Sequence, residues 1–334
     1  MNIKRLTDYR NVWMGVAMLL IISFHSDISF GNTTLNTLRT FGYGGVDIFL
    51  LAAGFGNYFS YFKDENPLNF IKRKIYRLMP TYIPFIAVWC LYQVLINDED
   101  PYYIIGNLLG IQGLSSSGFY FNWYLTVLVI CYILTPYFAS YIKNTNLIKN
   151  ALLVIILVLA STAFWRDDTL IISFTRLPIF VIGMIFAKYS DVQLDKKYYI
   201  LSSFFCIVGI IILRIFYIYK PNHLWGFGFY WYPFILITPF ICTIISLIAM
   251  CLEKTPILNY LVTLTKKIGT LSFELYLVHI FVFDIVKIQL KESSYTSSNL
   301  LWFAITIIVF ILALLLNVIS KLIRRILKIC IGHV

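Results

Sequence analysis

Charged residues are scarce in this sequence of 334 residues, of which Asp, Glu, Lys and Arg make up only 13%. Soluble domains carry about a quarter charged residues, so the composition excludes an ordinary cytoplasmic enzyme. Hydrophobic residues account for 60% of the chain. Ten membrane helices of ~20 residues would occupy about 200 positions, which is a similar share of the length. The composition therefore predicts a polytopic membrane protein.

Cysteines are few, and the six present are scattered, mostly within apolar runs. Their spacing excludes a disulfide scaffold and a zinc site, and the sequence indicates no metal centre. The chain also lacks an internal repeat, a low-complexity tract and a connection long enough to fold alone, the longest being 98–120. We therefore expect one membrane domain over residues 1–334 and no separate soluble domain.

Ten apolar stretches alternate with short polar breaks and predict an all-α fold with about ten transmembrane helices. A further apolar stretch, 102–113, is too short to span a bilayer and is predicted to lie at its surface or to re-enter it. The predicted spans are 12–30, 41–62, 78–97, 121–142, 150–166, 169–188, 198–219, 230–252, 270–290 and 300–320.

Lysine and arginine residues divide unequally between the two sets of connections. With the N-terminus inside, the predicted cytoplasmic segments hold 20 of them and the outer segments hold five, Arg39 and Lys287 among the latter. This asymmetry is typical of the positive-inside rule. It predicts that both termini are cytoplasmic and that the protein lies in the cell (cytoplasmic) membrane, in contact with its lipids. It also accounts for the net charge of +11 without a nucleic-acid partner.

A few charged or titratable side chains fall inside the predicted spans, where each costs about 3 kcal/mol or more and marks a functional candidate. The helical rise places most of them in the outer half of the bilayer, so we expect them to converge on one outward-facing chamber. Two alternatives stay open: His25 can be a packing hydrogen bonder, and Asp47 with Arg176 can form a structural ion pair. The candidates are His25, Asp27, Asp47, Arg176, Arg214, Glu274, His279 and Asp284.

A basic segment that contains Lys72, Arg73, Lys74 and Arg77 is predicted at the cytoplasmic surface. Lys74 and Arg77 are three residues apart and therefore share one face of a helix. Basic residues at this surface commonly reflect topology and lipid head groups. The functional alternative is a clamp for a phosphorylated cytoplasmic donor, because arginine forks suit phosphate groups.

Five stretches, in order along the chain, resemble the acyltransferase 3 family of integral-membrane O-acyltransferases. Singly each match is weak, but the five occur in the family order and cover most of the chain. The first ends at a histidine, the third is basic, and the fifth ends at a second histidine. These stretches are 15–25, 44–55, 70–80, 123–136 and 272–279.

The resemblance implies about ten membrane helices and the transfer of an acyl group, commonly acetyl from acetyl-CoA, to a sugar hydroxyl. The implied acceptor is a surface polysaccharide or a lipid-linked glycan. Acyl-CoA is then the donor substrate, and no permanently bound cofactor is implied. The resemblance carries the catalytic base onto His25 and the donor-side basic pair onto Lys74 and Arg77.

The sequence departs from the family pattern at three positions. Met14 replaces the basic residue that the family has eleven residues before the histidine, and Arg10 lies one turn below it. Lys74 replaces the first arginine of the basic pair and so lacks the bidentate fork. Ala53 replaces the serine that precedes Gly54. None of these changes alters the predicted fold.

The chemistry of acyl transfer assigns roles to the candidate side chains. A sugar hydroxyl needs a base, and neutral imidazole is the side chain best suited near neutral pH. We expect His25 to take the hydroxyl proton, with Asp47 or Asp27 orienting its imidazole. Arg176 is expected to stabilise the developing oxyanion. The residues assigned to the acceptor side are Asp27, Trp123 and His279.

Two other functions stay open on the sequence. A transporter or flippase for a glycan or lipid would use the same polar chamber and needs no thioester chemistry. Two weakly similar halves would favour it, and the sequence shows none. The second is an inactive family relative that serves as a partner subunit.

Overall fold

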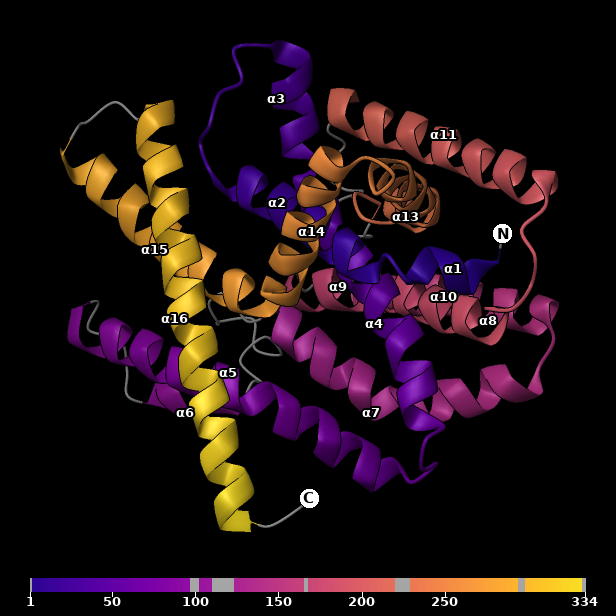
Figure 1. Cartoon of the computed structure of the whole chain (residues 1–334), viewed down its shortest axis with the longest axis horizontal. Helices are drawn as coiled ribbons and strands as arrows, with labels where there is room; N and C mark the ends of the chain where they lie inside the picture. Colours follow the sequence, from indigo (N-terminus) through magenta and orange to yellow (C-terminus); the bar gives the residue numbers. More distant parts are fainter. Residues whose placement is uncertain are drawn as a thin grey trace.

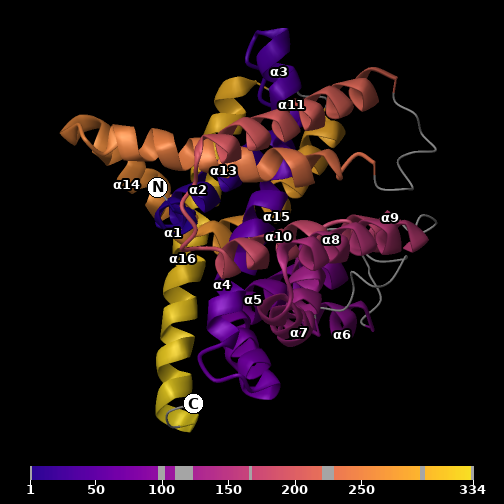
Figure 2. The same ribbon diagram turned by 90° about the vertical axis from the view of Figure 1, so that its right-hand side faces the viewer.

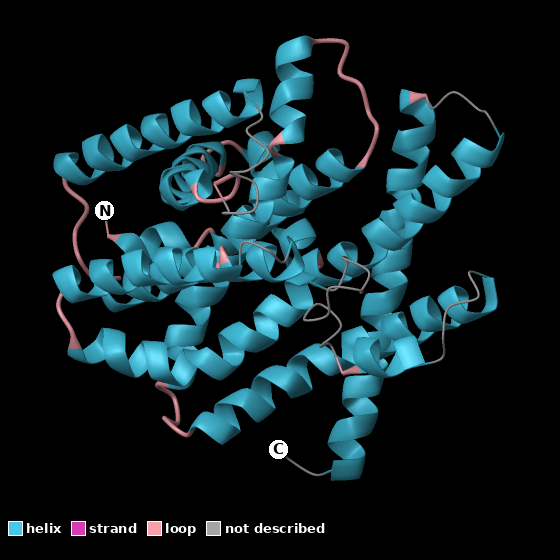
Figure 3. Cartoon of the chain, turned by 180° about the vertical axis from the view of Figure 1, so that it is seen from behind, coloured by secondary structure: helices cyan, strands magenta, loops and turns pink. Residues whose placement is uncertain are grey.

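The computed structural model describes residues 2–96, 102–109, 123–164, 168–219, 229–293 and 298–331. Within these ranges every regular element is a helix, and the β contact is one isolated bridge between Asn2 and Gln193 (Figure 3). The all-α prediction is confirmed. The elements are α1 Ile3–Thr7, α2 Arg10–His25, α3 Thr33–Thr40, η1 Gly42–Gly44, α4 Gly45–Tyr61, α5 Pro67–Ile96, α6 Tyr102–Leu108, α7 Trp123–Asn144, α8 Leu147–Ser161, η4 Thr162–Phe164, α9 Asp168–Phe174, α10 Leu177–Lys188, α11 Lys196–Tyr219, α13 Pro233–Leu252, α14 Pro256–Thr270, α15 Ser272–Ser293 and α16 Asn299–Ile331.

Seven helical segments among the described residues are long and apolar enough to cross a membrane. Each coincides with a predicted span, so the protein is a multi-pass membrane protein. Six of the segments are α5, α7, α8 with η4, α11, α13 and α16, and the seventh runs through α9 and α10.

The other three predicted spans are also helical. Two are short, since α2 has 16 residues and α4 has 17. The third, α15, has 22 residues but carries Glu274, Asp284 and Lys287. The count of ten spans and the cytoplasmic placement of both termini stay predictions. Of the predicted surface or re-entrant stretch 102–113, α6 forms the first part, and residues 110–113 lie outside the described residues.

The helix α14 occupies a segment that the sequence analysis treats as a connection. It is amphipathic: Ile257, Leu261 and Leu264 are exposed at helical spacing, whereas Val262 and Gly269 are buried. The buried side of α14 packs on α2 (Figures 1 and 2). A Cβ atom added to Gly15 would lie 2.1 Å from the carbonyl oxygen of Thr265, so only glycine permits this approach.

Two helix pairs run in the same direction at the centre of the bundle. In the first, Gly15 of α2 meets Gly269 of α14, and ten residues further along each chain segment His25 meets His279 of α15. The shared spacing shows that α2 runs parallel to α14 and α15 and that the glycine contact sets the register of the two histidines.

The second pair consists of α4 and α10, and it also combines a close glycine contact with a pair of polar side chains. A Cβ atom on Gly54 would lie 1.9 Å from the carbonyl oxygen of Phe180, and one on Gly183 would lie 2.2 Å from that of Leu51. Seven residues before this contact on both helices, Asp47 meets Arg176. A close glycine contact thus fixes the register of an intramembrane polar pair in each case.

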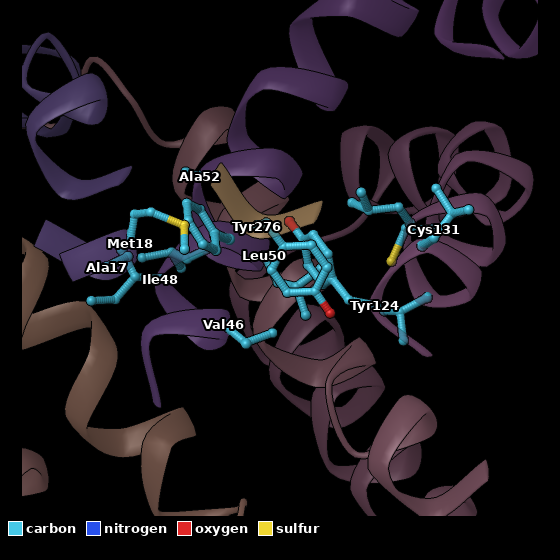
Figure 4. Packing of buried hydrophobic residues seen from close by; sticks show 14 of the residues in the cluster. Ala17, Met18, Val46, Ile48, Leu50, Ala52, Tyr124, Cys131 and Tyr276 are labelled. Atoms are coloured by element: carbon cyan, nitrogen blue, oxygen red, sulfur yellow. The ribbon is translucent and has the colours of Figure 1, made fainter. Parts of the chain in front are cut away.

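Apolar side chains from α2, α4, α7 and α15 fill the space around these pairs (Figure 4). Tyr124 of α7 and Tyr276 of α15 meet there with their ring centroids 4.7 Å apart. The outer helices α11 and α16 lie at opposite edges of the molecule (Figure 1). They expose many leucine and isoleucine side chains, which suits contact with lipid.

Candidate active site

His25 is the last residue of α2, and its imidazole is held from two sides. Its Nδ1 atom lies 3.0 Å from the carbonyl oxygen of Ile21 and 3.4 Å from Nε2 of His279. In turn, Nδ1 of His279 lies 3.0 Å from the carbonyl oxygen of Leu275. His279 is completely buried, whereas His25 is partly exposed.

These contacts determine where the protons sit. A backbone carbonyl only accepts hydrogen bonds, so Nδ1 carries the proton in both rings. Nε2 of His279 is then a lone-pair acceptor that faces the Nδ1–H group of His25. The remaining nitrogen of His25, Nε2, keeps a lone pair to which none of the described residues donates. This is the arrangement that a general base requires, with His279 in the place that an orienting carboxylate has in other sites.

The end of α2 is fixed by cations from two other helices. Lys287 of α15 donates to the carbonyl oxygen of His25 at 2.7 Å and lies 3.7 Å from the carboxylate of Asp27. Arg39 of α3 donates to the carbonyl oxygens of Ser23 and Ser26. Cations are favourable at a helix C-terminus, where backbone carbonyls lack partners. From the sequence, Lys287 and Arg39 are recognised only as basic residues of the outer segments, and this role is not predicted.

We expect Lys287→Met to lower the rate of acylation about 10- to 100-fold, because a charged hydrogen bond to the backbone of His25 is lost. The donor KM should stay unchanged, since Lys287 lies at the far end of α2 from the basic segment. Lys287→Arg should restore most of the rate. The measurements are the rate and the donor KM of acyl transfer by the purified protein in nanodiscs, with the donor concentration varied. A Lys287→Met protein with the wild-type rate would contradict the positioning role.

Asp47 and Arg176 form a buried ion pair between α4 and α10, with side chains only 1% and 2% exposed. The guanidinium carbon of Arg176 also lies 6.0 Å from the ring centroids of Trp123 and Trp231. Its Nε atom is buried without a hydrogen-bond partner among the described residues. The two side chains therefore form the ion pair that the sequence leaves open as one alternative. The Nε–H group of Arg176 has no acceptor among the described residues.

A cavity of about 370 Å³ brings part of the predicted site together. His25, Arg176 and Trp123 all line it, together with Tyr276. Asp47 does not line the cavity, and it is connected to the cavity lining by its ion pair with Arg176. The imidazole of His25 and the guanidinium of Arg176 thus line one cavity, and acyl transfer uses a base and a cation together in this way.

The carboxylates have partners other than the imidazole. Asp47 binds Arg176 and Asp27 lies by Lys287, so His279 is the described group beside Nδ1 of His25. The predicted convergence of polar groups on one chamber is therefore partial. The other predicted intramembrane groups lie apart: Arg214 is exposed beside Tyr217, Glu274 accepts from Asn317 at 2.9 Å, and Asp284 is half-buried on α15.

The basic segment lies toward the opposite end of α2 from His25. Lys74 is close enough to Arg77 and Arg10 for their charges to repel, and its amine lies 5.1 Å from the ring centroid of Phe70. Within the described part of the chain, none of these three cations forms an ion pair. Fifteen helical steps, ~22 Å, separate Arg10 from His25. Cations without an acidic partner are available to a polyanion, whether lipid head groups or a phosphorylated donor.

Comparison with known proteins identifies the family. A family model described as an acyltransferase domain, of the acyltransferase 3 type, matches residues 11–319. The chain belongs to the acyltransferase 3 family. Searches of curated proteins and of solved structures gave no match.

Four of the five family stretches, which lie far apart in the sequence, contribute residues to the site. The first and fifth family stretches supply the two histidines, which are 3.4 Å apart. The second supplies Asp47, and the fourth begins at Trp123, which lines the cavity. The family position that Met14 occupies is half-buried on α2, and Arg10 lies against Gly56 on the neighbouring helix α4. As an acyltransferase 3 protein, the chain is a membrane acyltransferase.

Proposed function

We propose that this acyltransferase moves an acyl group, acetyl from acetyl-CoA, onto a hydroxyl of a surface polysaccharide or a lipid-linked glycan at the cell membrane. The observation that carries the proposal is the cavity shared by His25 and Arg176. It brings an imidazole that can take a hydroxyl proton together with a guanidinium whose charge can stabilise an oxyanion, and the tautomer of His25 is set by two acceptors.

The reaction balances with these two side chains. Nε2 of His25 takes the proton of the sugar hydroxyl while the oxygen forms a bond to the thioester carbonyl carbon. The carbonyl oxygen becomes an oxyanion, which the positive charge of the Arg176 guanidinium stabilises. The carbon–sulfur bond then breaks, and the CoA sulfur leaves with the proton that His25 returns. His279 stabilises the imidazolium by accepting from its Nδ1–H.

The donor is proposed to lie along α2. The phosphates of CoA would bind the cationic cluster of Arg10, Lys74 and Arg77, which has no acidic partner among the described residues. The thioester would reach His25 at the other end of the helix, ~22 Å away, through the extended arm of the donor. A long molecule with a polyanionic end and a reactive end matches this separation.

We expect Lys74→Gln/Arg77→Gln to weaken acetyl-CoA binding on the order of 10- to 100-fold, because charged hydrogen bonds to phosphate are lost. Isothermal titration of purified protein in nanodiscs measures the Kd. Wild-type binding should also weaken with added salt.

The matched control is Lys72→Gln/Arg73→Gln, which removes the same charge from two exposed positions of the same helix. It should bind acetyl-CoA like the wild type. Equal Kd values for both double variants would mean that the segment serves topology alone.

A further inference from the structure

The side of the cavity near the end of α2 is built from aromatic rings. Tyr217 of α11, and Tyr230 with Trp231 just before α13, line it together with Phe24 and Phe41. The ring of Phe24 lies 4.8 Å from that of His25, and the ring of Phe41 lies 5.5 Å from that of Tyr217. These five residues are here called the aromatic wall. The catalytic imidazole therefore stands at the edge of a ring-lined surface.

Four of the five wall residues lie outside the family stretches, and the fifth, Phe24, belongs to the first of them. Tyr217, Tyr230 and Trp231 lie on or next to α11 and α13, which pack chiefly on each other. Tyr43 of η1 connects this pair to the site, because its hydroxyl donates to the carbonyl oxygen of Tyr230 at 3.2 Å. The base and the oxyanion donor thus belong to the central helices, whereas Tyr217, Tyr230 and Trp231 of the wall belong to a separate helix pair.

The charges around the cavity restrict what can bind. Among the described residues that line it there is no Asp or Glu, and its cation, Arg176, is already paired with Asp47. A ligand with a free ammonium group would lose its hydration without gaining an anionic partner. The cavity thus favours an uncharged ligand. Its volume of about 370 Å³ is also at the small end of ligand pockets, which suits a single small ring.

We infer that the aromatic wall binds one face of an uncharged pyranose ring and presents a ring hydroxyl to His25. One face of a pyranose carries C–H groups and is apolar, so it stacks on aromatic rings, while its hydroxyls hydrogen-bond at the edge. Tyr217 is the wall residue chosen for the test, since its ring meets that of Phe41 edge-on and its side chain lines the cavity. This assignment rests on the proposed function for its hydroxyl chemistry, but sugar binding itself can be measured without a donor.

The experiment is saturation-transfer NMR on purified protein in nanodiscs, with methyl β-D-glucopyranoside and methyl β-D-galactopyranoside as probes. Acyclic sorbitol and methyl β-D-glucosaminide are the comparison ligands. We expect saturation of ring C–H protons for at least one neutral pyranoside and none for sorbitol or the amino sugar. Binding of both comparison ligands as strong as that of the neutral pyranosides would overturn the assignment.

Variants of two neighbouring tyrosines locate the site. Tyr217→Ala should weaken pyranoside binding about 3- to 10-fold, and Tyr217→Phe, which keeps the ring, should retain it. The control is Tyr219→Ala on the same helix, because Tyr219 is 75% exposed and does not line the cavity. Unchanged binding by Tyr217→Ala would overturn the assignment, even if acyl transfer is intact. Tyr217-dependent binding without any acyl transfer would support the assignment and refute the proposed function instead.

Discussion

His25→Ala is expected to lower the rate of glycan acylation by about 10²–10⁴, the usual cost of losing a general base. The variant removes the lone pair that faces the cavity but leaves the helix contacts of α2 in place. His279→Ala should lower the rate less, because Nδ1 of His25 keeps its second acceptor, the carbonyl oxygen of Ile21 at 3.0 Å. The measurement is acylated glycan per cell by mass spectrometry, with membrane abundance checked by blot.

The order of the two histidine variants is the informative result. A larger loss from His279→Ala than from His25→Ala would reverse their roles. Near-normal acylation by a well-inserted His25→Ala protein would remove His25 from the mechanism and favour the transport function. His279→Gln is a useful companion, since an amide oxygen can still accept a hydrogen bond from Nδ1–H.

Arg176→Met is expected to destabilise the protein by about 3–5 kcal/mol, because it leaves the carboxylate of Asp47 buried without a partner. The double variant Asp47→Leu/Arg176→Met removes both charges and should recover most of that stability. Thermal unfolding of the detergent-solubilised protein measures both effects. The single variant Asp47→Leu should be as unstable as Arg176→Met.

The activity of the double variant separates the two interpretations of this ion pair. If Arg176 stabilises the oxyanion, the double variant is stable but loses about 10²–10³ in rate, as when an oxyanion donor is removed. If the pair is structural alone, the stable double variant retains its activity. The place of Arg176 in the lining of the cavity that it shares with His25 favours the first outcome.

The central site was largely predictable because buried polar residues are rare in an apolar chain. His25 and Arg176 stand out from their spans, and the structure places both at one cavity. The helices were predictable because the backbone of a long apolar run in a membrane must form its hydrogen bonds within the segment, as an α-helix does. The sequence predicts His279 as secondary to His25, on the acceptor side or as a supporting hydrogen bonder, and its contact with His25 depends on a register set by Gly15 and Gly269.

The remainder of the site depends on contacts that the sequence does not encode locally. Lys287 was counted as a loop charge because charge patterns do not show which backbone carbonyl a lysine meets. Asp27 follows His25 closely in sequence, but the chain leaves the helix at Ser26 in an extended conformation and brings Asp27 to Lys287. Tyr217 could not be singled out among 24 tyrosines and 28 phenylalanines. The amphipathic α14 was treated as a connection because its apolar positions are interrupted by polar ones.

The central claim, that this chain acylates a glycan through His25, is tested most directly by the mass of the surface glycan in three strains. These are a deletion strain and the same strain complemented with the wild-type or the His25→Ala protein. The account predicts that wild-type complementation adds the mass of an acetyl group to the glycan and that His25→Ala adds none. A glycan of the same mass in all three strains, with both proteins present in the membrane, would contradict it.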